Sequence, residues 1–143
     1  MSLRLAFLNT ALRFGEKRRL ARVSDPVELR RIADFKARLM LRAPRGTSIR
    51  CEPLAGRDLY WLAAPGASDS KVILYLHGGG YMFGSLHTHR AVMGHLSRLT
   101  GCVVAMPDYR LAPENPFPAA LDDAFLAYDA LRKAGYAPQE IIF

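Results

Sequence analysis

The sequence predicts an α/β fold in which helices cover a largely parallel β-sheet. Short apolar runs at residues 71–76, 102–107 and 140–143 are typical of strands buried on both faces of such a sheet. Segments with helical periodicity separate these runs, so strand and helix alternate along the chain. The 143 residues are 50% hydrophobic and 23% charged, which suits one globular domain.

Two amphipathic helices are predicted before the first strand. Residues 3–22 repeat apolar side chains at helical spacing. The second helix begins after Asp25, a good N-cap residue, with Pro26 at the first helical position and Glu28 at capping-box spacing. It ends before residues 42–46, which contain Pro and Gly.

Basic charge is concentrated in this N-terminal part. Residues 1–50 hold 13 of the 20 Lys and Arg but 4 of the 13 Asp and Glu, while the whole chain has a net charge of +7. We favour a solvated helix surface and keep contact with a membrane surface as the alternative. No nucleic-acid partner is expected, because aromatic residues do not alternate with the basic ones.

From residue 47 the pattern changes to that of strands and crossover helices. Residues 48–54 and 58–64 are predicted to form a β-hairpin. Helices are predicted from Thr88 to Thr100, where Gly101 closes the helix, and over residues 118–133. Each helix would connect two parallel strands by a right-handed crossover.

The two cysteines, Cys51 and Cys102, have neither metal nor redox spacing, so we expect reduced thiols and a cytoplasmic protein. Residues 5–12 are the one candidate for the apolar part of a signal peptide. Because they contain polar residues and lack a small-residue cleavage site, we do not expect a signal peptide. No stretch has the length and apolarity of a membrane span.

Three contiguous glycines follow the predicted strand at 71–76, in the sequence LHGGGYMFGS at residues 76–85. A phosphate-binding loop does not fit, because the glycines lack the G-x-G-x-x-G spacing and no lysine follows them. Ligands of α/β sheets bind beyond the carboxyl ends of strands. Contiguous glycines there suit backbone N–H groups that point at one oxygen, as in the HGGG-type oxyanion loop of lipases and esterases.

A second stretch, DYRLAPENPFPAALDDA at residues 108–124, follows the next predicted strand. Together the two stretches resemble the hormone-sensitive-lipase-like branch of the α/β-hydrolase fold, the HGGG group of bacterial carboxylesterases. The resemblance implies a helical cap segment over residues 1–46 and the N-terminal portion of the hydrolase core over residues 47–143. It also implies a serine carboxylic-ester hydrolase that acts on small-molecule esters without a cofactor or metal.

The same resemblance assigns roles within the glycine loop. Gly79 and Gly80 would supply the N–H donors of the oxyanion hole, with His77 and Gly78 as support for the loop. The substrate pocket would be lined by the three residues after the glycines, namely Tyr81, Met82 and Phe83. Packing of these three beneath the cap is the alternative.

Two other groups of polar residues are given structural interpretations. We expect a network that fixes the loop after residue 107 from the four residues Asp108, Tyr109, Arg110 and Glu114. A metal site is not expected from the three residues His87, His89 and His95, because positions 89 and 95 do not share one helix face.

A Gly-x-Ser-x-Gly elbow, which such hydrolases need, is absent from the sequence, and all four histidines lie between positions 77 and 95. We therefore expect the chain to stop before its nucleophile and to be inactive alone. A non-catalytic ligand-binding or decayed hydrolase fragment is the alternative. The sequence does not predict the oligomeric state.

Overall fold

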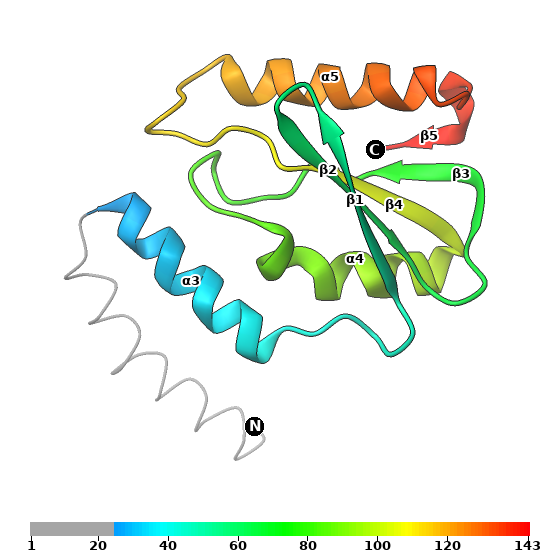
Figure 1. Ribbon diagram of the computed structural model, residues 1–143, viewed down its shortest axis with the longest axis horizontal. Helices are drawn as coiled ribbons and strands as arrows, with labels where there is room; N and C mark the ends of the chain where they lie inside the picture. The colour runs from blue at the N-terminus through cyan, green and yellow to red at the C-terminus, as the bar shows by residue number, and fades with distance from the viewer. Residues whose placement is uncertain (1–24) are drawn as a thin grey trace, which may run out of the picture.

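A computed structural model describes residues 25–143, and the helix expected over residues 3–22 lies outside them. Figure 1 shows a central sheet with helices on both sides. In chain order the elements are α3 (Pro26–Met40), β1 (Ser48–Leu54), β2 (Arg57–Ala63), β3 (Ser68–Leu74), α4 (Leu86–Thr100), β4 (Cys102–Pro107), α5 (Ala119–Lys133), the 3₁₀ turn η2 (Pro138–Glu140) and β5 (Ile141–Ile142).

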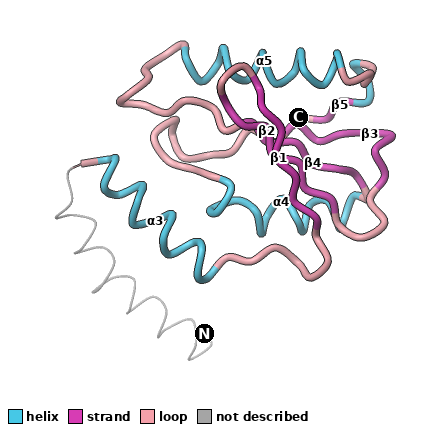
Figure 2. The backbone as a smooth tube through the Cα atoms, in the orientation of Figure 1, coloured by secondary structure: helices cyan, strands magenta, loops and turns pink. Residues whose placement is uncertain are grey.

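The sheet has the strand order β1-β2-β4-β3-β5, which can be followed in Figure 2. β1 and β2 form the predicted antiparallel hairpin, and β2 is antiparallel to β4. β3 lies parallel to both β4 and β5, which confirms the predicted α/β class.

Each central strand is buried on both faces, as its apolar sequence predicts. In β4, Val104 and Met106 pack with Met93 of α4, whereas Ala105 packs with Ala127 of α5 on the opposite face. Successive residues of a strand point to opposite faces, so this alternation places one helix on each side of the sheet.

β3 differs from the prediction, since it spans residues 68–74 instead of 71–76. Its polar start pairs Ser68 with Cys102, and the register then shifts before Val72 pairs with Val103. The strand continues as a single backbone contact, because the Tyr75 N–H donates to the Ala105 carbonyl at 2.7 Å. The loop that bears the glycines therefore leaves the sheet earlier than the apolar run indicates.

α3 and α4 begin with side-chain N-caps, whereas α5 follows Pro118 and has none. The capping box predicted for Asp25 and Glu28 at α3 does not form there. Asp25 caps α3 through the Val27 N–H at 2.9 Å. The reciprocal capping box occurs at α4, where Ser85 and Thr88 bond each other's backbone. Gly101 ends α4 in the left-handed conformation, at φ 71°. Because only glycine adopts that conformation at little cost, the predicted stop of α4 is confirmed.

The apolar stripe expected on α3 is only partly buried. Phe35 and Leu39 are 65% and 62% exposed, and the buried residue of the helix is Ala37. The contact between this part of the chain and α4 uses small residues. A side chain at Gly94 of α4 would place its Cβ 2.6 Å from Pro44 Cδ. The segment after α3 therefore approaches α4 closely at Gly94.

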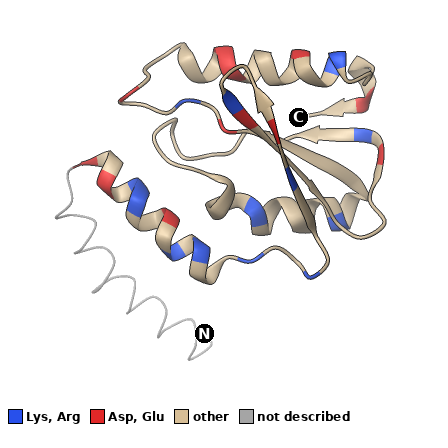
Figure 3. Ribbon diagram, in the orientation of Figure 1, with Lys and Arg blue, Asp and Glu red and all other residues tan. Residues whose placement is uncertain are grey.

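Charges of both signs occur along α3, as Figure 3 shows. Asp34 lies 3.8 Å from Arg38 one turn later, so part of the basic charge is compensated within the helix. Among residues 25–143, no helix is long and apolar enough to cross a membrane. Both cysteines are free thiols.

Candidate active site

The glycine loop joins β3 to α4 at the carboxyl end of a central strand. β3 has a neighbour on each side, β4 and β5, and its chain direction is parallel to both. Ligands of open α/β sheets bind at this end of the strands. The fold therefore places residues 75–85 where a site is expected.

A tight turn shapes the loop around Gly79. The Gly79 carbonyl accepts hydrogen bonds from the Met82 N–H at 3.2 Å and the Phe83 N–H at 3.0 Å. Gly79 has φ 131°, and a Cβ at this position would lie 2.2 Å from the Phe83 carbonyl oxygen. Any side chain at Gly79 would therefore break the turn.

Gly80 is in the left-handed conformation at φ 62°, but the space beside its Cα is open. Its N–H belongs to the same planar peptide group as the Gly79 carbonyl, and in a trans peptide the two point in opposite directions. The carbonyl faces into the turn, so the Gly80 N–H faces away from it. Within residues 25–143 neither the Gly79 nor the Gly80 N–H donates to a protein acceptor.

Gly79 and Gly80 both line a cavity of about 320 Å³. The three glycines, Tyr81 and Tyr109 line one side of it, and the first turns of α5 line the other through Ala120, Leu121 and Ala124. An apolar groove of about 370 Å³ shares Leu76 and Leu121 with this cavity and continues to Phe125 and Phe143. The cavity and the groove together place N–H donors that have no protein acceptor within residues 25–143 beside an apolar wall.

The residues expected to line a substrate pocket lie in different places. Tyr81 lines the cavity and is 67% exposed. Met82 and Phe83 are half-buried and are not part of its lining. Their backbone groups form the turn, and the Met82 carbonyl accepts a hydrogen bond from Arg30.

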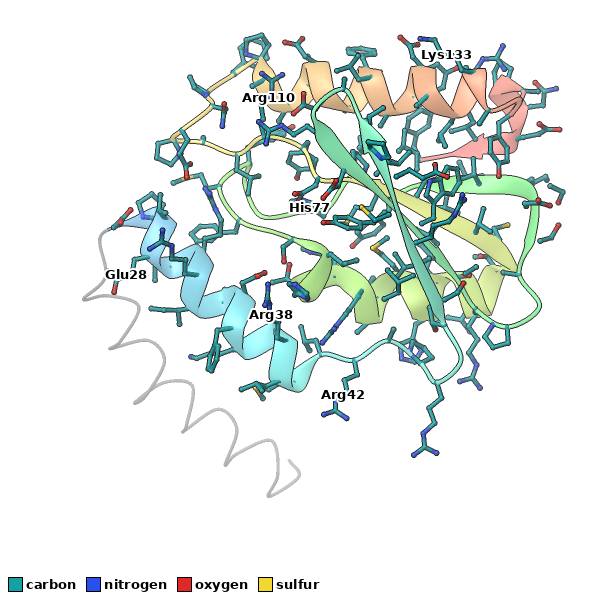
Figure 4. The ribbon with its side chains drawn as sticks, viewed as in Figure 1. Glu28, Arg38, Arg42, His77, Arg110 and Lys133 are labelled. Carbon is teal, nitrogen blue, oxygen red and sulfur yellow. The ribbon has the colours of Figure 1, made fainter. Side chains whose placement is uncertain are left out.

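His77 lies at the start of the loop and is 4% exposed. Its ring is stacked between Tyr109, at a centroid distance of 4.2 Å, and His89, at 5.0 Å. Figure 4 shows His77 among the interior side chains, and Arg110 beside the first turn of α5. A Cβ at Gly84 would lie 2.1 Å from His77 Nδ1, so the loop closes directly over the imidazole.

The imidazole orients the peptide group that carries the Gly79 N–H. His77 Nδ1 lies 3.0 Å from the Gly78 carbonyl, which belongs to that peptide group. The Tyr109 hydroxyl donates to the His77 carbonyl. Burial lowers the pKa of His77, although the Gly78 carbonyl acts in the opposite direction. A neutral ring with its proton on Nδ1 satisfies the Gly78 carbonyl.

Arg30 of α3 is a site residue that the sequence interpretation missed. Its Nε donates to the Met82 carbonyl at 2.9 Å, and its Nη2 donates to the Ala112 carbonyl at 2.8 Å. It also forms an ion pair with Glu114, at 2.9 Å and 3.2 Å. No pattern could have found it, because its partners lie 52 to 84 residues away and Arg31 has the same chemistry.

The polar residues after β4 bind separate elements instead of forming one network. Arg110 makes a bidentate ion pair with Asp123 of α5, and the backbone N–H of Arg110 donates to the same carboxylate at 2.8 Å. Burial would raise the pKa of Asp123, but the hydrogen bonds and charge of Arg110 outweigh it and hold that pKa below its usual range. For Asp108, burial raises the pKa, and the charge of Asp58 adds to the effect.

A larger cavity of about 510 Å³ lies between α3 and the segment after β4. Its walls are charged, but Arg30 is already paired with Glu114, and Arg110 with Asp123. In residues 25–143 no group of three or more side chains is arranged to hold a metal ion. The cavity at the glycine loop is therefore the stronger candidate.

Comparisons with known proteins identify a family of similar chains. The profile of a family described as α/β hydrolase fold matches residues 73–143. An esterase from Acinetobacter venetianus is 40% identical over 119 residues, which are 82% of this chain and 38% of the esterase. The carboxylesterase/phospholipase LipF of Mycobacterium tuberculosis is 35% identical over 113 residues, covering 76% of this chain and 30% of LipF.

Solved structures give the same match in three dimensions. A crystal structure of an esterase from the bacterial hormone-sensitive lipase family has a TM-score of 0.76 at 40% identity and covers 83% of this chain and 40% of that one. The EstE5-PMSF structure has a TM-score of 0.81 at 34% identity, covering 99% of this chain and 47% of that one. The chain thus spans less than half the length of these relatives.

Proposed function

Because this chain belongs to the hormone-sensitive-lipase-like branch of the α/β-hydrolase fold family, we propose that it forms the oxyanion-binding part of a serine carboxylesterase. One observation carries the proposal. Gly79 and Gly80 line the cavity, and within residues 25–143 their N–H groups have no protein acceptor. The carbonyls of the same two peptide groups are hydrogen-bonded on the other side of the loop. Fixed N–H donors of this kind stabilise a developing negative charge.

In the proposed reaction a serine Oγ gives its proton to a general base as it attacks the carbonyl carbon of the ester, and the π electrons of the C=O bond move to the carbonyl oxygen. The protonated base then serves as the general acid. Gly79 and Gly80 then donate hydrogen bonds to that oxyanion. Collapse of the tetrahedral intermediate expels the alkoxide, which takes a proton from the general acid, and water later hydrolyses the acyl-enzyme.

The nucleophile would come from residues other than these 143, because the sequence lacks the Gly-x-Ser-x-Gly elbow. His77 is assigned to loop support. Its buried neutral ring holds the Gly78 carbonyl.

The substrate we propose is a small ester with a short to medium acyl chain. The apolar groove that continues from the cavity has space for such a chain along Leu76, Leu121 and Phe125. The names of the relatives support an ester, since they include esterases and a carboxylesterase/phospholipase. One EstE5 crystal was soaked with p-nitrophenyl butyrate.

We also propose the division into a cap segment, residues 1–46, and a core portion, residues 47–143. The contacts of Arg30 support it, because they join α3 to two loops of the core without making α3 part of the sheet. A cytoplasmic location is retained as a proposal and rests on the two free thiols.

The proposal is tested with a hybrid esterase, in which this chain replaces the matching region of the Acinetobacter venetianus esterase. The hybrid should hydrolyse p-nitrophenyl butyrate, and the 143-residue chain alone should not. A folded hybrid without activity, as judged by circular dichroism and thermal unfolding, would contradict the proposal. Activity of the chain alone that a serine-directed phosphonate abolishes would show that the nucleophile lies within it.

A further inference from the structure

Arg30 directs a charged donor at the turn that holds Gly79 and Gly80. Its side chain is 23% exposed, and its Nε donates to the Met82 carbonyl at 2.9 Å. Figure 1 shows the first turns of α3 next to the loops that follow β3 and β4. The remaining donors bind the Ala112 carbonyl and Glu114, so the guanidinium is held in one orientation.

Two peptide groups connect this guanidinium to the Gly80 N–H. The Met82 carbonyl belongs to the peptide group whose N–H is that of Phe83. The Phe83 N–H donates to the Gly79 carbonyl at 3.0 Å. The Gly79 carbonyl in turn belongs to the peptide group whose N–H is that of Gly80. Each link is a hydrogen bond or a planar peptide group, so the series has no gap.

A hydrogen bond accepted by a carbonyl makes the N–H of the same peptide group a better donor. Chains of such bonds strengthen one another by roughly 10–30% per bond. A charged donor at the head of the chain makes a bond about twice as strong as a neutral one. The series also fixes the plane of each peptide group, and hence the direction of the last N–H.

We propose that Arg30 is a positioning residue that orients and polarises the Gly80 N–H through these two peptide groups. Its catalytic consequence rests on the proposed function, whereas the polarisation itself does not. Arg30 also anchors α3 to the core, and the test must separate this structural role from the polarisation of the Gly80 N–H. Glu114→Gln removes the ion pair but leaves the bond from Nε to Met82, and Arg31→Gln removes an equal charge one residue away.

The polarisation is measured by NMR of the 143-residue chain labelled with ¹⁵N-glycine, which has 11 glycine signals. A weaker donor has an amide proton at higher field. Arg30→Gln should move the Gly80 amide proton upfield by more than Glu114→Gln or Arg31→Gln does. The signals of Gly101 and Gly135, which lie at the far ends of α4 and α5, should stay in place and so report an intact fold.

An unmoved Gly80 signal in Arg30→Gln would overturn the proposal. If Arg30→Gln disturbs Gly101 and Gly135 as well, Arg30→Lys takes its place, because it keeps the positive charge but lacks the guanidinium fork. Its Gly80 proton should move in the same direction by a smaller amount, and no movement there would likewise overturn the proposal.

Kinetics of the hybrid esterase test the catalytic consequence. Arg30→Gln should lower kcat by about 5- to 30-fold with little change in KM, because it weakens a donor whose outright loss costs about 10²–10³-fold. Arg31→Gln should keep kcat within about two-fold, and Glu114→Gln should lower kcat by less than Arg30→Gln does. If the hybrid does depend on the Gly80 N–H but Arg30→Gln leaves kcat unchanged, the positioning role of Arg30 is overturned and the proposed function is not. A hybrid that does not depend on that N–H would instead overturn the proposed function.

Discussion

The ring of Tyr109 lies flat against that of His77, at a centroid distance of 4.2 Å and an interplanar angle of 15°, and the Tyr109 hydroxyl donates to the His77 carbonyl. Two residues 32 positions apart in sequence thus fix the start of the glycine loop. Burial raises the pKa of Tyr109 to about 12, so the hydroxyl keeps its proton at neutral pH.

Tyr109→Phe should keep the ring stack but leave the buried His77 carbonyl without its donor. A buried polar group that loses its partner costs about 1–3 kcal/mol. We expect the free energy of unfolding to fall by that amount in urea titrations of the chain. Tyr128→Phe, on the half-buried face of α5, serves as the matched control. Equal stability of Tyr109→Phe and the parent would show that the hydroxyl does not hold the loop.

Gly79→Ala should destabilise the chain far more than Gly78→Ala. A side chain at Gly79 would meet the Phe83 carbonyl at 2.2 Å and would require φ 131°, whereas Gly78 has open space and no positive φ. Backbone strain alone costs about 1–3 kcal/mol. Thermal unfolding of the two variants compares them directly, and similar melting temperatures would mean that the turn is not as tight as described. Gly79→Ala is therefore a poor probe of chemistry, because it disrupts the fold first.

The chain should become less stable as the pH falls below about 6.5, the ordinary pKa of histidine. Burial lowers the pKa of both His77 and His89. The unfolded chain then binds protons that the folded chain does not, so stability is full above this pH and is lost below it. Within residues 25–143 the titratable groups whose rings contact His77 and His89, apart from each other, are the phenols Tyr75 and Tyr109.

The pH effect is measured by urea unfolding at pH 7.5 and pH 5.5. His89→Gln should lose part of the difference between the two pH values, and His95→Gln, at an exposed position of α4, should keep it. An undiminished difference in His89→Gln would show that other groups cause the pH dependence.

Asp123→Asn should destabilise the chain by about 1.5–3 kcal/mol, because it replaces charge-assisted hydrogen bonds and leaves Arg110 without its counter-ion. Asp123 is 4% exposed, and its carboxylate takes both side-chain and backbone donors of Arg110. Asp122→Asn, at the exposed neighbouring position, is the control. Equal denaturation midpoints for the two variants would show that the ion pair between Arg110 and Asp123 does not anchor the loop to α5.

The sequence predicted the elements with strong periodicity. The hairpin, α4 and α5 occur within two residues of the expected bounds, because apolar spacing and Gly101 mark them. β3 was shifted, because its polar first residues carry no strand pattern. α3 was predicted to be amphipathic, but its spacing does not decide the burial of Phe35, which depends on what packs against the helix.

The candidate site was predictable only where a local motif encodes it. Contiguous glycines after a buried strand mark the loop by themselves. The contacts that hold the loop do not follow from any local pattern. Arg30, His89 and Tyr109 come from a helix before the sheet, a helix after the loop and the end of another strand. Only the folded chain brings these three together.

Removal of the Gly80 N–H is the sharpest test of whether this group binds the oxyanion. In the hybrid esterase, residue 80 is replaced by glycolic acid, which exchanges the amide N–H for an ester oxygen and adds no side chain. The same exchange at Gly66, another open position with positive φ at 79°, is the control. We predict that the exchange at residue 80 lowers kcat by about 10²–10³-fold with KM little changed, while the exchange at residue 66 leaves kcat near that of the parent. Equal kcat values for the two exchanges would contradict it.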